Sequence, residues 1–262
     1  MESAESLSGK LLRSAKYYYR RPSELQDRVI GELDRRLHPQ PRQNIDLLGC
    51  QKSLDPVHEL LGTSDVPCQL CEGFDEALAR AVILVPNANH HDSAAATARA
   101  AWTAVRHLRP QHVVETGVAR GITSAVILQA LARNESGHLW SIDLPEVYLV
   151  VSGEAGAAVP EDLRGEWTVL RGASRRLLPS LLRRLTSIDL FLHDSLHTHR
   201  NMLFEFELAW SYLRPQGALI ADDIDHSTAF RDFTQRVVSP CRVQRRLTDS
   251  GALGVIVKPP VS

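Results

Sequence analysis

The chain has no run of about 18 consecutive apolar residues and no excess of charge of one sign. Without such a run, no segment is long enough to cross a bilayer as a helix, so we expect no membrane span. The 30 lysines and arginines almost balance the 31 acidic residues, and a net charge of -1 gives no reason to expect binding to nucleic acid or membranes. Residues 1–22 do not contain the apolar core of a secretory signal, so we expect a cytoplasmic protein.

Cysteine is scarce as well. Cys50, Cys68, Cys71 and Cys241 are too few for a disulfide scaffold in 262 residues, and a reducing compartment is the default. Cys68 and Cys71 form an isolated C-x-x-C pair, whereas zinc normally takes four ligands. Cys50 and His58 could complete a Cys₃His site, so zinc stays an open alternative. We favour free thiols or simple packing.

The most informative part of the sequence is residues 112–145. An apolar strand leads into a glycine-containing turn at 115–121, a helix rich in Ala, Ile and Leu, and a second strand that ends at Asp143. Gly117 and Gly121 let the backbone pass close under a ligand, and amides at the helix start can face its polar atoms. Asp143 is placed to accept hydrogen bonds from both ribose hydroxyls. The pattern is typical of half a nucleotide-binding α/β unit.

The turn also discriminates between cofactors. It reads E-T-G-x-x-x-G-x-x-S from Glu115 to Ser124, whereas a dinucleotide site requires G-x-G-x-x-G to hold a pyrophosphate. A cofactor with a ribose but no phosphate fits better, and S-adenosylmethionine is the common one. The residues that we expect to bind it are Glu115, Thr116, Gly117, Gly121, Ser124 and Asp143, with Ser174 near the adenine and Asp194 at a neighbouring strand end.

Strands and helices alternate beyond residue 112. We predict strands near 112–115, 138–142, 167–170, 188–193 and 217–221, and helices near 92–108, 122–133, 173–185, 199–213 and 227–237. Segments 242–247 and 253–257 flank a turn at Asp249-Ser250-Gly251, which is a hairpin signal. The predicted fold is α/β: a Rossmann-like, mostly parallel sheet of class I methyltransferase type, with a C-terminal antiparallel hairpin and an N-terminal helical segment.

The N-terminal part carries no comparable motif. We expect helix over residues 5–37 and an irregular connector over 38–72, so that 1–85 form an extension or lid and 86–262 the methyltransferase domain. Basic residues between positions 10 and 21 are unopposed by acids, which is typical of a solvated helix face or a dimer contact; a surface that meets an acidic partner or a membrane is the alternative. A homo-oligomer formed through these helices is therefore an expectation.

Two predicted strands end in carboxylates: Asp194 follows the first, and Asp222 and Asp223 follow the second. The carboxyl ends of parallel strands meet at one edge of a sheet, so these acids should converge on the cofactor turn. Close carboxylates repel one another unless a cation lies among them, and oxygen ligands suit Mg²⁺. The alternative for any one of them is capping of the following helix.

His197 comes three residues after Asp194, at the same edge. A neutral imidazole there could act as general base, although a hydrogen-bonded loop histidine is the alternative. On the helix that follows, Glu205 and Glu207 are expected to face water. The apolar face of that helix is expected to consist of Met202, Phe206, Ala209, Trp210 and Leu213.

Residues 90–258 resemble class I S-adenosylmethionine-dependent methyltransferases. More narrowly, residues 191–225, FLHDSLHTHRNMLFEFELAWSYLRPQGALIADDID, are similar to the metal-dependent small-molecule and sugar O-methyltransferases of natural-product pathways, the macrocin and mycinamicin methyltransferase kind. The resemblance implies that Asp194, Asp222 and Asp223 bind Mg²⁺ and that His197 is the base. Ser195 departs from it, because many relatives have glycine there.

The resulting expectation is Mg²⁺-assisted methylation of a hydroxyl on a small natural product or sugar. Hydroxylation or rearrangement on the same fold is an alternative. An NAD-dependent oxidoreductase is disfavoured by the missing third glycine and the terminal hairpin. A non-enzymatic binding module would leave the acids at the strand ends unexplained.

Overall fold

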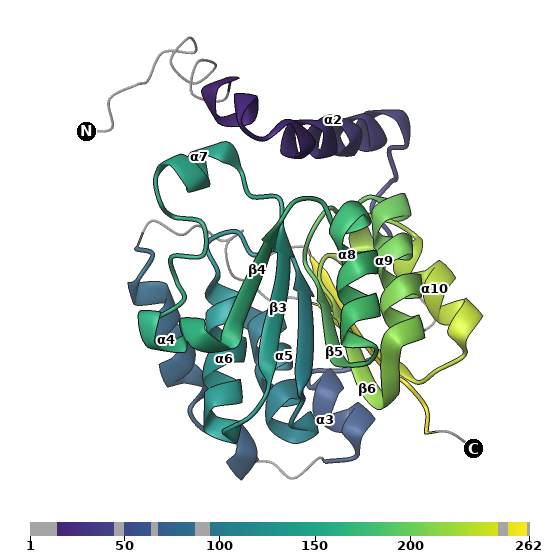
Figure 1. Ribbon diagram of the computed structural model, residues 1–262. Helices are drawn as coiled ribbons and strands as arrows, with labels where there is room; N and C mark the ends of the chain where they lie inside the picture. Colours follow the sequence, from purple (N-terminus) through teal and green to yellow (C-terminus); the bar gives the residue numbers. More distant parts are fainter. Residues whose placement is uncertain (1–14, 45–49, 64–67, 87–94, 246–250, 261–262) are drawn as a thin grey trace.

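A computed structural model describes residues 15–44, 50–63, 68–86, 95–245 and 251–260 (Figure 1). The strands are β1 (Gln51–Lys52), β2 (His112–Thr116), β3 (His138–Asp143), β4 (Trp167–Arg171), β5 (Ile188–His193), β6 (Leu213–Ala221), β7 (Cys241–Arg245) and β8 (Ala252–Val257). The helices are α2 (Pro22–Leu37), α3 (Pro56–Leu61), α4 (Phe74–Ile83), α5 (Ala95–Leu108), α6 (Ile122–Asn134), α7 (Val147–Val151), α8 (Ser174–Leu185), α9 (His199–Tyr212) and α10 (Ala229–Val237). Short 3₁₀ turns are η2 (Gln69–Cys71), η3 (Glu161–Glu166) and η4 (Ile224–His226).

The strands form one eight-stranded sheet in the order β1-β7-β8-β6-β5-β2-β3-β4 within the described ranges. From β6 to β4 all neighbours are parallel, whereas β8 runs antiparallel between β6 and β7. The predicted α/β fold with a closing antiparallel pair is thus confirmed. Strand order reverses between β2 and β5, and this switch point is where open α/β sheets bind ligands.

Helices cover both faces of the sheet (Figure 1). Successive side chains of a strand point to opposite faces, so Val113 packs in the cluster with α4, α5 and α6, and Val114 packs in the cluster with α8, α9 and α10. Because β2 is buried on both faces, its apolar residues need not alternate with polar ones. This burial fixes the carboxyl end of β2, from which the glycine turn begins.

The N-terminal part is more regular than the sequence indicated. The connector predicted for 38–72 contains β1, α3 and η2, and that expectation is therefore wrong for residues 51–52, 56–61 and 69–71. Only the part of the predicted 5–37 helix from residue 15 onward is described. None of the helices described is long and apolar enough to serve as a membrane span.

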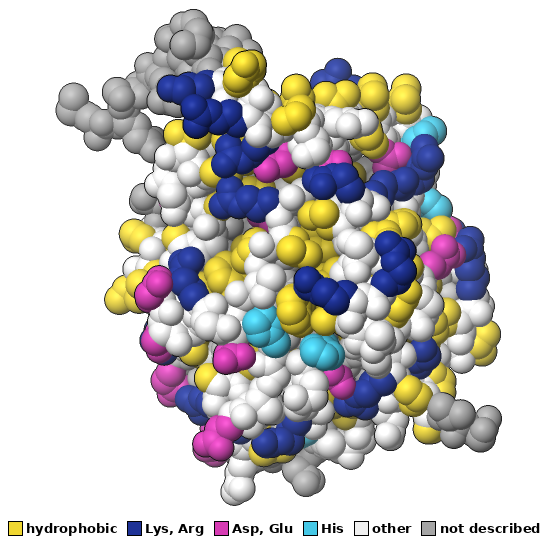
Figure 2. All heavy atoms as spheres, in the orientation of Figure 1, with side chains coloured by type: hydrophobic (Ala, Val, Ile, Leu, Met, Phe, Trp, Pro, Cys, Tyr) yellow, Lys and Arg dark blue, Asp and Glu magenta, His cyan; other side chains and the backbone are white. Residues whose placement is uncertain are grey.

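The helix α2 lies across one edge of the sheet (Figure 1). Its outer face is apolar and forms a row of hydrophobic side chains along the top of Figure 2. The members that are at least 43% exposed are Leu25, Val29, Ile30, Leu33 and Leu37. A continuous apolar row of this kind on a surface helix is a candidate contact face.

The prediction of free thiols is wrong for two of the four cysteines. Cys50 and Cys241 form a disulfide with their Cα atoms 5.3 Å apart. The cause is the parallel pairing of β1 with β7. This pairing sets Gln51 opposite Arg242 and so brings the two preceding residues, Cys50 and Cys241, together. Disulfides are uncommon in reducing compartments, so this bond does not favour the cytoplasmic location. That location stays a prediction.

Candidate functional site

The glycine turn after β2 packs against the end of β5. Gly117 has φ +90°, and a Cβ there would lie 1.8 Å from the carbonyl oxygen of Asp194. The amide of Asp194 in turn donates to the carbonyl of Thr116 over 2.8 Å. Gly121, with φ +85°, precedes the first residue of α6. Glycine is required at 117 because no side chain fits between the two strand ends.

A cavity of about 240 Å³ opens at this edge of the sheet. Of the predicted cofactor residues, four line it, namely Gly117, Asp143, Ser174 and Asp194. The cavity also lies beside the turn residues Val118 and Ala119 and under α2. The turn, the end of β3, the start of α8 and the end of β5 therefore meet at one place, as their position in a parallel sheet requires.

Glu115 and Ser124 lie behind the turn rather than in the cavity. The hydroxyls of Ser124 and Ser141 each donate to Oε2 of Glu115 over 2.7 Å. Burial raises the pKa of Glu115 to about 7, against the opposing effect of these hydrogen bonds. The arrangement joins β2, α6 and β3 under the turn, so these two residues hold the shape of the cavity floor.

Asp143 is the titratable group of the cavity floor. Burial raises its pKa to about 6, although the Val118 amide, which donates to Oδ1 over 3.2 Å, acts in the opposite direction. The side chain is therefore mostly ionised at neutral pH and can accept further hydrogen bonds from a ligand.

Glu205, on α9, is a residue for which the sequence prediction is wrong. Its side chain is fully buried instead of facing water, and it lies 2.6 Å from Nδ1 of His193, which is also fully buried. Thr116 and Ser195 donate their hydroxyls to it over 2.6 and 2.8 Å, and Asn201 adds an amide donor over 2.8 Å. One carboxylate thus ties the end of β2 to the loop after β5.

The charge of Glu205 is kept by its partners. Burial alone would raise its pKa, but the charge and hydrogen bond of His193, with hydrogen bonds from Ser174 and Thr116, lower it below the ordinary value. No sequence pattern singled it out, because an acid beside an apolar helix face ordinarily faces water. The polar residues at the ends of β2 and β5, Thr116 and His193, could have indicated that a buried partner was needed.

His197 lies between two of the predicted acids. Its Nε2 is 3.7 Å from Oδ1 of Asp194, and its Nδ1 is 3.8 Å from Oδ2 of Asp223. His226, which the sequence analysis did not select, lies on the other side of Asp223, with Nε2 3.7 Å from Oδ2. The structure therefore places the predicted base beside two of the three predicted metal ligands, Asp194 and Asp223.

Asp222 takes a different direction from its neighbour Asp223. It is buried, and its Oδ1 accepts a hydrogen bond of 2.8 Å from Thr97 on α5. Capping does not account for these acids, because Thr198 is the N-cap of α9 and the Asp223 side chain makes no cap hydrogen bond at η4.

The donor atoms of His197, Asp223 and His226 lie within 4.8 Å of one another, close enough to face a common ion. Carboxylate oxygens with imidazole nitrogens are a donor set that divalent cations accept. The residues present therefore fit a divalent cation near His197.

The helix α2 forms the roof of the cavity. Arg28 donates to the carbonyl oxygens of Leu144 and Pro145 over 3.0 and 2.8 Å and pairs with Glu146 at 2.7 Å. On the other side of the cavity, Asp27 accepts from the amide of Ala173 over 3.0 Å. The roof is thus held to the chain after β3 and to the chain before α8, by residues that belong to no motif.

Comparison with known proteins adds three findings. Residues 114–224 match a family described as a methyltransferase domain. Solved structures with the same fold include TomG from Streptomyces achromogenes, an O-methyltransferase involved in tomaymycin synthesis, in complex with S-adenosylmethionine. It matches at TM-score 0.53 and 19% identity, covering 70% of this chain and 90% of that chain. An O-methyltransferase from Bacillus cereus in complex with S-adenosylhomocysteine matches at TM-score 0.50 and 15% identity, covering 81% of this chain and 100% of that chain. No curated protein sequence gives a significant match.

Proposed function

We propose, from the premise that this chain is a class I methyltransferase, that it transfers the methyl group of S-adenosylmethionine to a hydroxyl oxygen of a small molecule. The observation that carries the proposal is the cavity at the carboxyl edge of the sheet, with Asp143 in its floor and Asp194 connecting it to His197. Binding of S-adenosylmethionine by TomG, which has the same fold, supports the choice of cofactor.

In this proposal the chain's main contribution is alignment. Asp143 would bind the ribose hydroxyls, and Gly117, Ser174 and Asp194, which line the same cavity, would hold the rest of the cofactor. Glu115, Thr116, Gly121 and Ser124 hold the turn in place. The turn at 115–121 does not have the G-x-G-x-x-G spacing that holds a pyrophosphate, and this supports S-adenosylmethionine over NAD.

A first prediction concerns Asp143. Asp143→Ala should weaken S-adenosylmethionine binding at least about tenfold, because hydrogen bonds to a charged group contribute about 1.5–3 kcal/mol each. The affinity of the wild-type chain should fall as the pH drops below about 6, since the protonated carboxyl loses its charge there. Calorimetry between pH 5 and pH 8 measures both effects.

The matched control is Asp143→Asn, which keeps the size of the side chain but cannot titrate. Its affinity should be low and independent of pH over this range. Unchanged affinity in both variants would remove Asp143 from the cofactor site. Tight binding of NAD in the same titrations would contradict the proposed cofactor.

We further propose that Asp194 and Asp223 would hold Mg²⁺ beside His197, with His226 next to them, whereas Asp222, whose Oδ1 accepts from Thr97, would anchor this end of the strand to α5. A bound Mg²⁺ supplies Lewis acidity that lowers the pKa of the acceptor hydroxyl. His197 would accept the hydroxyl proton while the oxygen bonds to the methyl carbon, and the carbon–sulfur bond would break to release S-adenosylhomocysteine. Asp194 and Asp223 hold the imidazole in place, since they lie on either side of it.

A second prediction tests the metal. EDTA should abolish methyl transfer and added Mg²⁺ should restore it, and Asp194→Asn and Asp223→Asn should each lose most activity while staying folded. Release of S-adenosylhomocysteine measures the reaction. Asp232→Asn, which removes the 3.0 Å partner of His199 at a distance from the cavity, is the control and should stay active. Full activity in the chelator would contradict a role for Mg²⁺.

We propose that the acceptor is a natural product or a sugar. The participation of TomG in tomaymycin synthesis supports a natural product, and the need for a base supports an aliphatic or sugar hydroxyl. Hydroxylation or rearrangement is the competing chemistry. The product mass separates them: methylation adds CH₂, hydroxylation adds one oxygen, and rearrangement leaves the mass unchanged.

The position of α2 over the cavity supports the proposal that residues 1–85 include a lid, and the apolar row on α2 supports a homo-oligomer through this helix. The near-neutral net charge supports a small-molecule partner rather than nucleic acid.

A further inference from the structure

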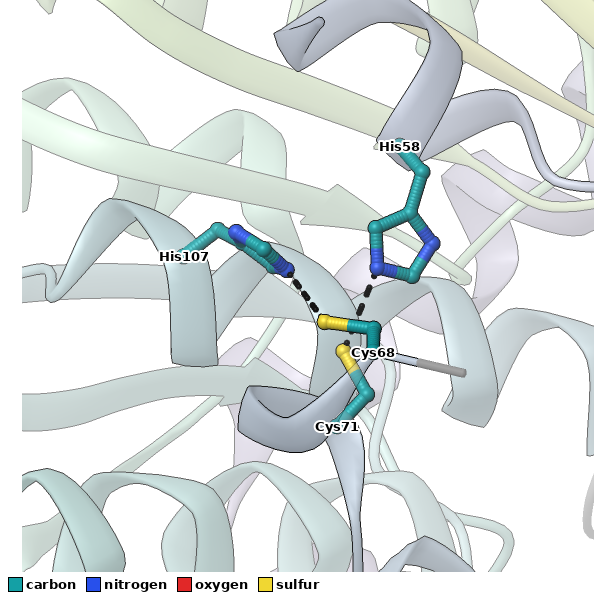
Figure 3. Close-up of side chains that lie close together, drawn as sticks. All are labelled: His58, Cys68, Cys71 and His107. Atoms are coloured by element: carbon teal, nitrogen blue, oxygen red, sulfur yellow. Dashed lines mark hydrogen bonds between the residues drawn. The ribbon is translucent and has the colours of Figure 1, made fainter. Parts of the chain in front are cut away.

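Two cysteines and two histidines form a cluster that the proposed reaction does not use (Figure 3). The Sγ of Cys68 is 3.2 Å from Nε2 of His107, and the Sγ of Cys71 is 3.4 Å from Nε2 of His58. One donor atom from each of the four residues lies within 4.8 Å of the others. Figure 3 shows all four side chains pointing toward one another from three different elements.

The local structure explains how the two sulfurs come together. The segment from Cys68 to Cys71 closes into the 3₁₀ turn η2, in which the amide of Cys71 donates to the carbonyl of Cys68 over 3.0 Å. The helix α5 holds this turn, because Trp102 and Arg106 donate to the carbonyls of Cys71 and Leu70 over 3.1 and 2.8 Å. Both sulfurs therefore face His107, near the end of the same helix.

The imidazole of His58 is oriented by a carboxylate. Its Nδ1 lies 2.5 Å from Oδ2 of Asp55, so Nε2 is directed at the sulfurs. His58 is itself buried, and its ring stands perpendicular to that of His107 with centroids 4.9 Å apart. A carboxylate behind a histidine is the usual arrangement around metal-bound imidazoles, since it fixes the tautomer that leaves Nε2 free to bind.

We propose that His58, Cys68, Cys71 and His107 bind a structural Zn²⁺ ion. Zinc takes four tetrahedral ligands at about 2.3 Å for sulfur and 2.0 Å for nitrogen, which puts sulfur and nitrogen about 3.5 Å apart. The two sulfur–nitrogen distances are within 0.3 Å of this value. Two thiolates balance the charge of the ion, so the site is neutral when loaded.

The ligand set differs from the one that the sequence suggested. Cys50 is excluded because it forms the disulfide with Cys241. His107 takes the fourth place; it lies 36 residues beyond Cys71, too far for any spacing rule to select it. A cavity of about 300 Å³ borders His58, Cys68 and Cys71 and provides a path for the ion to enter.

The position of the cluster indicates a structural role. Thr97, on α5, contacts Asp222 at the carboxyl edge of the sheet, and His107 lies ten residues further along the same helix, or about 15 Å away. The site also takes all four of its ligands from the protein, which leaves no position for a substrate. Zinc would join α3 and η2 to α5 and so fasten the N-terminal segment to the main domain.

The test is the metal content and zinc affinity of the full chain, purified with a reducing agent and without chelator. The wild type should contain one zinc per chain by mass spectrometry, and Co²⁺ should replace it with the visible absorption of a tetrahedral thiolate site. Cys71→Ser and His107→Ala should lose stoichiometric binding. Asp55→Asn should weaken binding by about 10–100-fold, as expected for a partner of a metal ligand.

Two controls keep the result specific. His138→Ala removes a half-buried histidine of β3. The double variant Cys50→Ser/Cys241→Ser removes the other two cysteine sulfurs, and both variants should retain one zinc. A wild-type chain that binds neither Zn²⁺ nor Co²⁺ would overturn the proposal even if the ligand variants do not fold. Equal zinc binding by Cys71→Ser and the wild type would also overturn it.

Discussion

Replacing His197 by alanine should lower the rate of methyl transfer by about 10²–10⁴-fold, the range that general acid–base catalysis contributes. The side chain lies between Asp194 and Asp223, at 3.7 and 3.8 Å, where it can take the proton of an acceptor hydroxyl. It does not line the cofactor cavity, so the affinity for S-adenosylmethionine should change little. Single-turnover kinetics and calorimetry on the same variant separate the two effects.

The pH–rate profile distinguishes a base from a residue that only supports the loop. If His197 accepts the proton, the fall in rate toward acid pH at saturating S-adenosylmethionine should be absent in His197→Ala, since a protonated imidazole is inactive and alanine cannot titrate. His199→Ala is the matched control: this histidine is two residues away, pairs with Asp232, and should leave the profile unchanged.

The size of the loss also reports on the acceptor. An aliphatic or sugar hydroxyl is weakly acidic and needs the base, whereas a phenol can ionise with the help of a metal alone. A small loss with an unchanged profile would contradict the assignment of His197 as base and favour a phenolic acceptor.

Replacing Glu205 by alanine should lower the free energy of unfolding by about 3–5 kcal/mol, the cost of removing the charged partner from a buried, hydrogen-bonded pair. His193 would remain fully buried without its partner, and the hydroxyls of Thr116 and Ser195 would lose their acceptor. Urea denaturation measures the change. Glu207→Ala is the control. Glu207 lies two positions along the same helix and its side chain is exposed, so the change should have little effect.

The acid dependence of stability provides a second readout. The pKa of Glu205 is lowered in the folded chain, so its contribution is complete above the ordinary pKa of glutamate and is lost as the pH falls through the folded value. This part of the acid dependence should be missing in Glu205→Ala. A stability close to that of the wild type would show that the buried pair contributes little.

Much of the fold could be predicted from local pattern. The alternation of apolar strands and helices from residue 112 onward predicted the parallel sheet, because each element is short and its hydrophobic period is set by its own residues. The same holds for Gly117, Asp143 and Asp194, which lie at or directly after the carboxyl ends of strands. In a parallel sheet, that position alone brings them to one edge. The antiparallel pairing of β7 with β8 was likewise confirmed, although the predicted turn at Asp249-Ser250-Gly251 lies partly outside the described residues.

The contacts between distant elements could not be predicted from the sequence. The burial of Glu205 depends on the ends of β2 and β5, and the disulfide of Cys50 depends on a two-residue strand that pairs 191 residues away. His226 and His107 join their clusters through tertiary packing that no spacing rule records. Local periodicity reports which face of an element is apolar, whereas these polar partners are selected by which faces meet, and only the folded chain decides that.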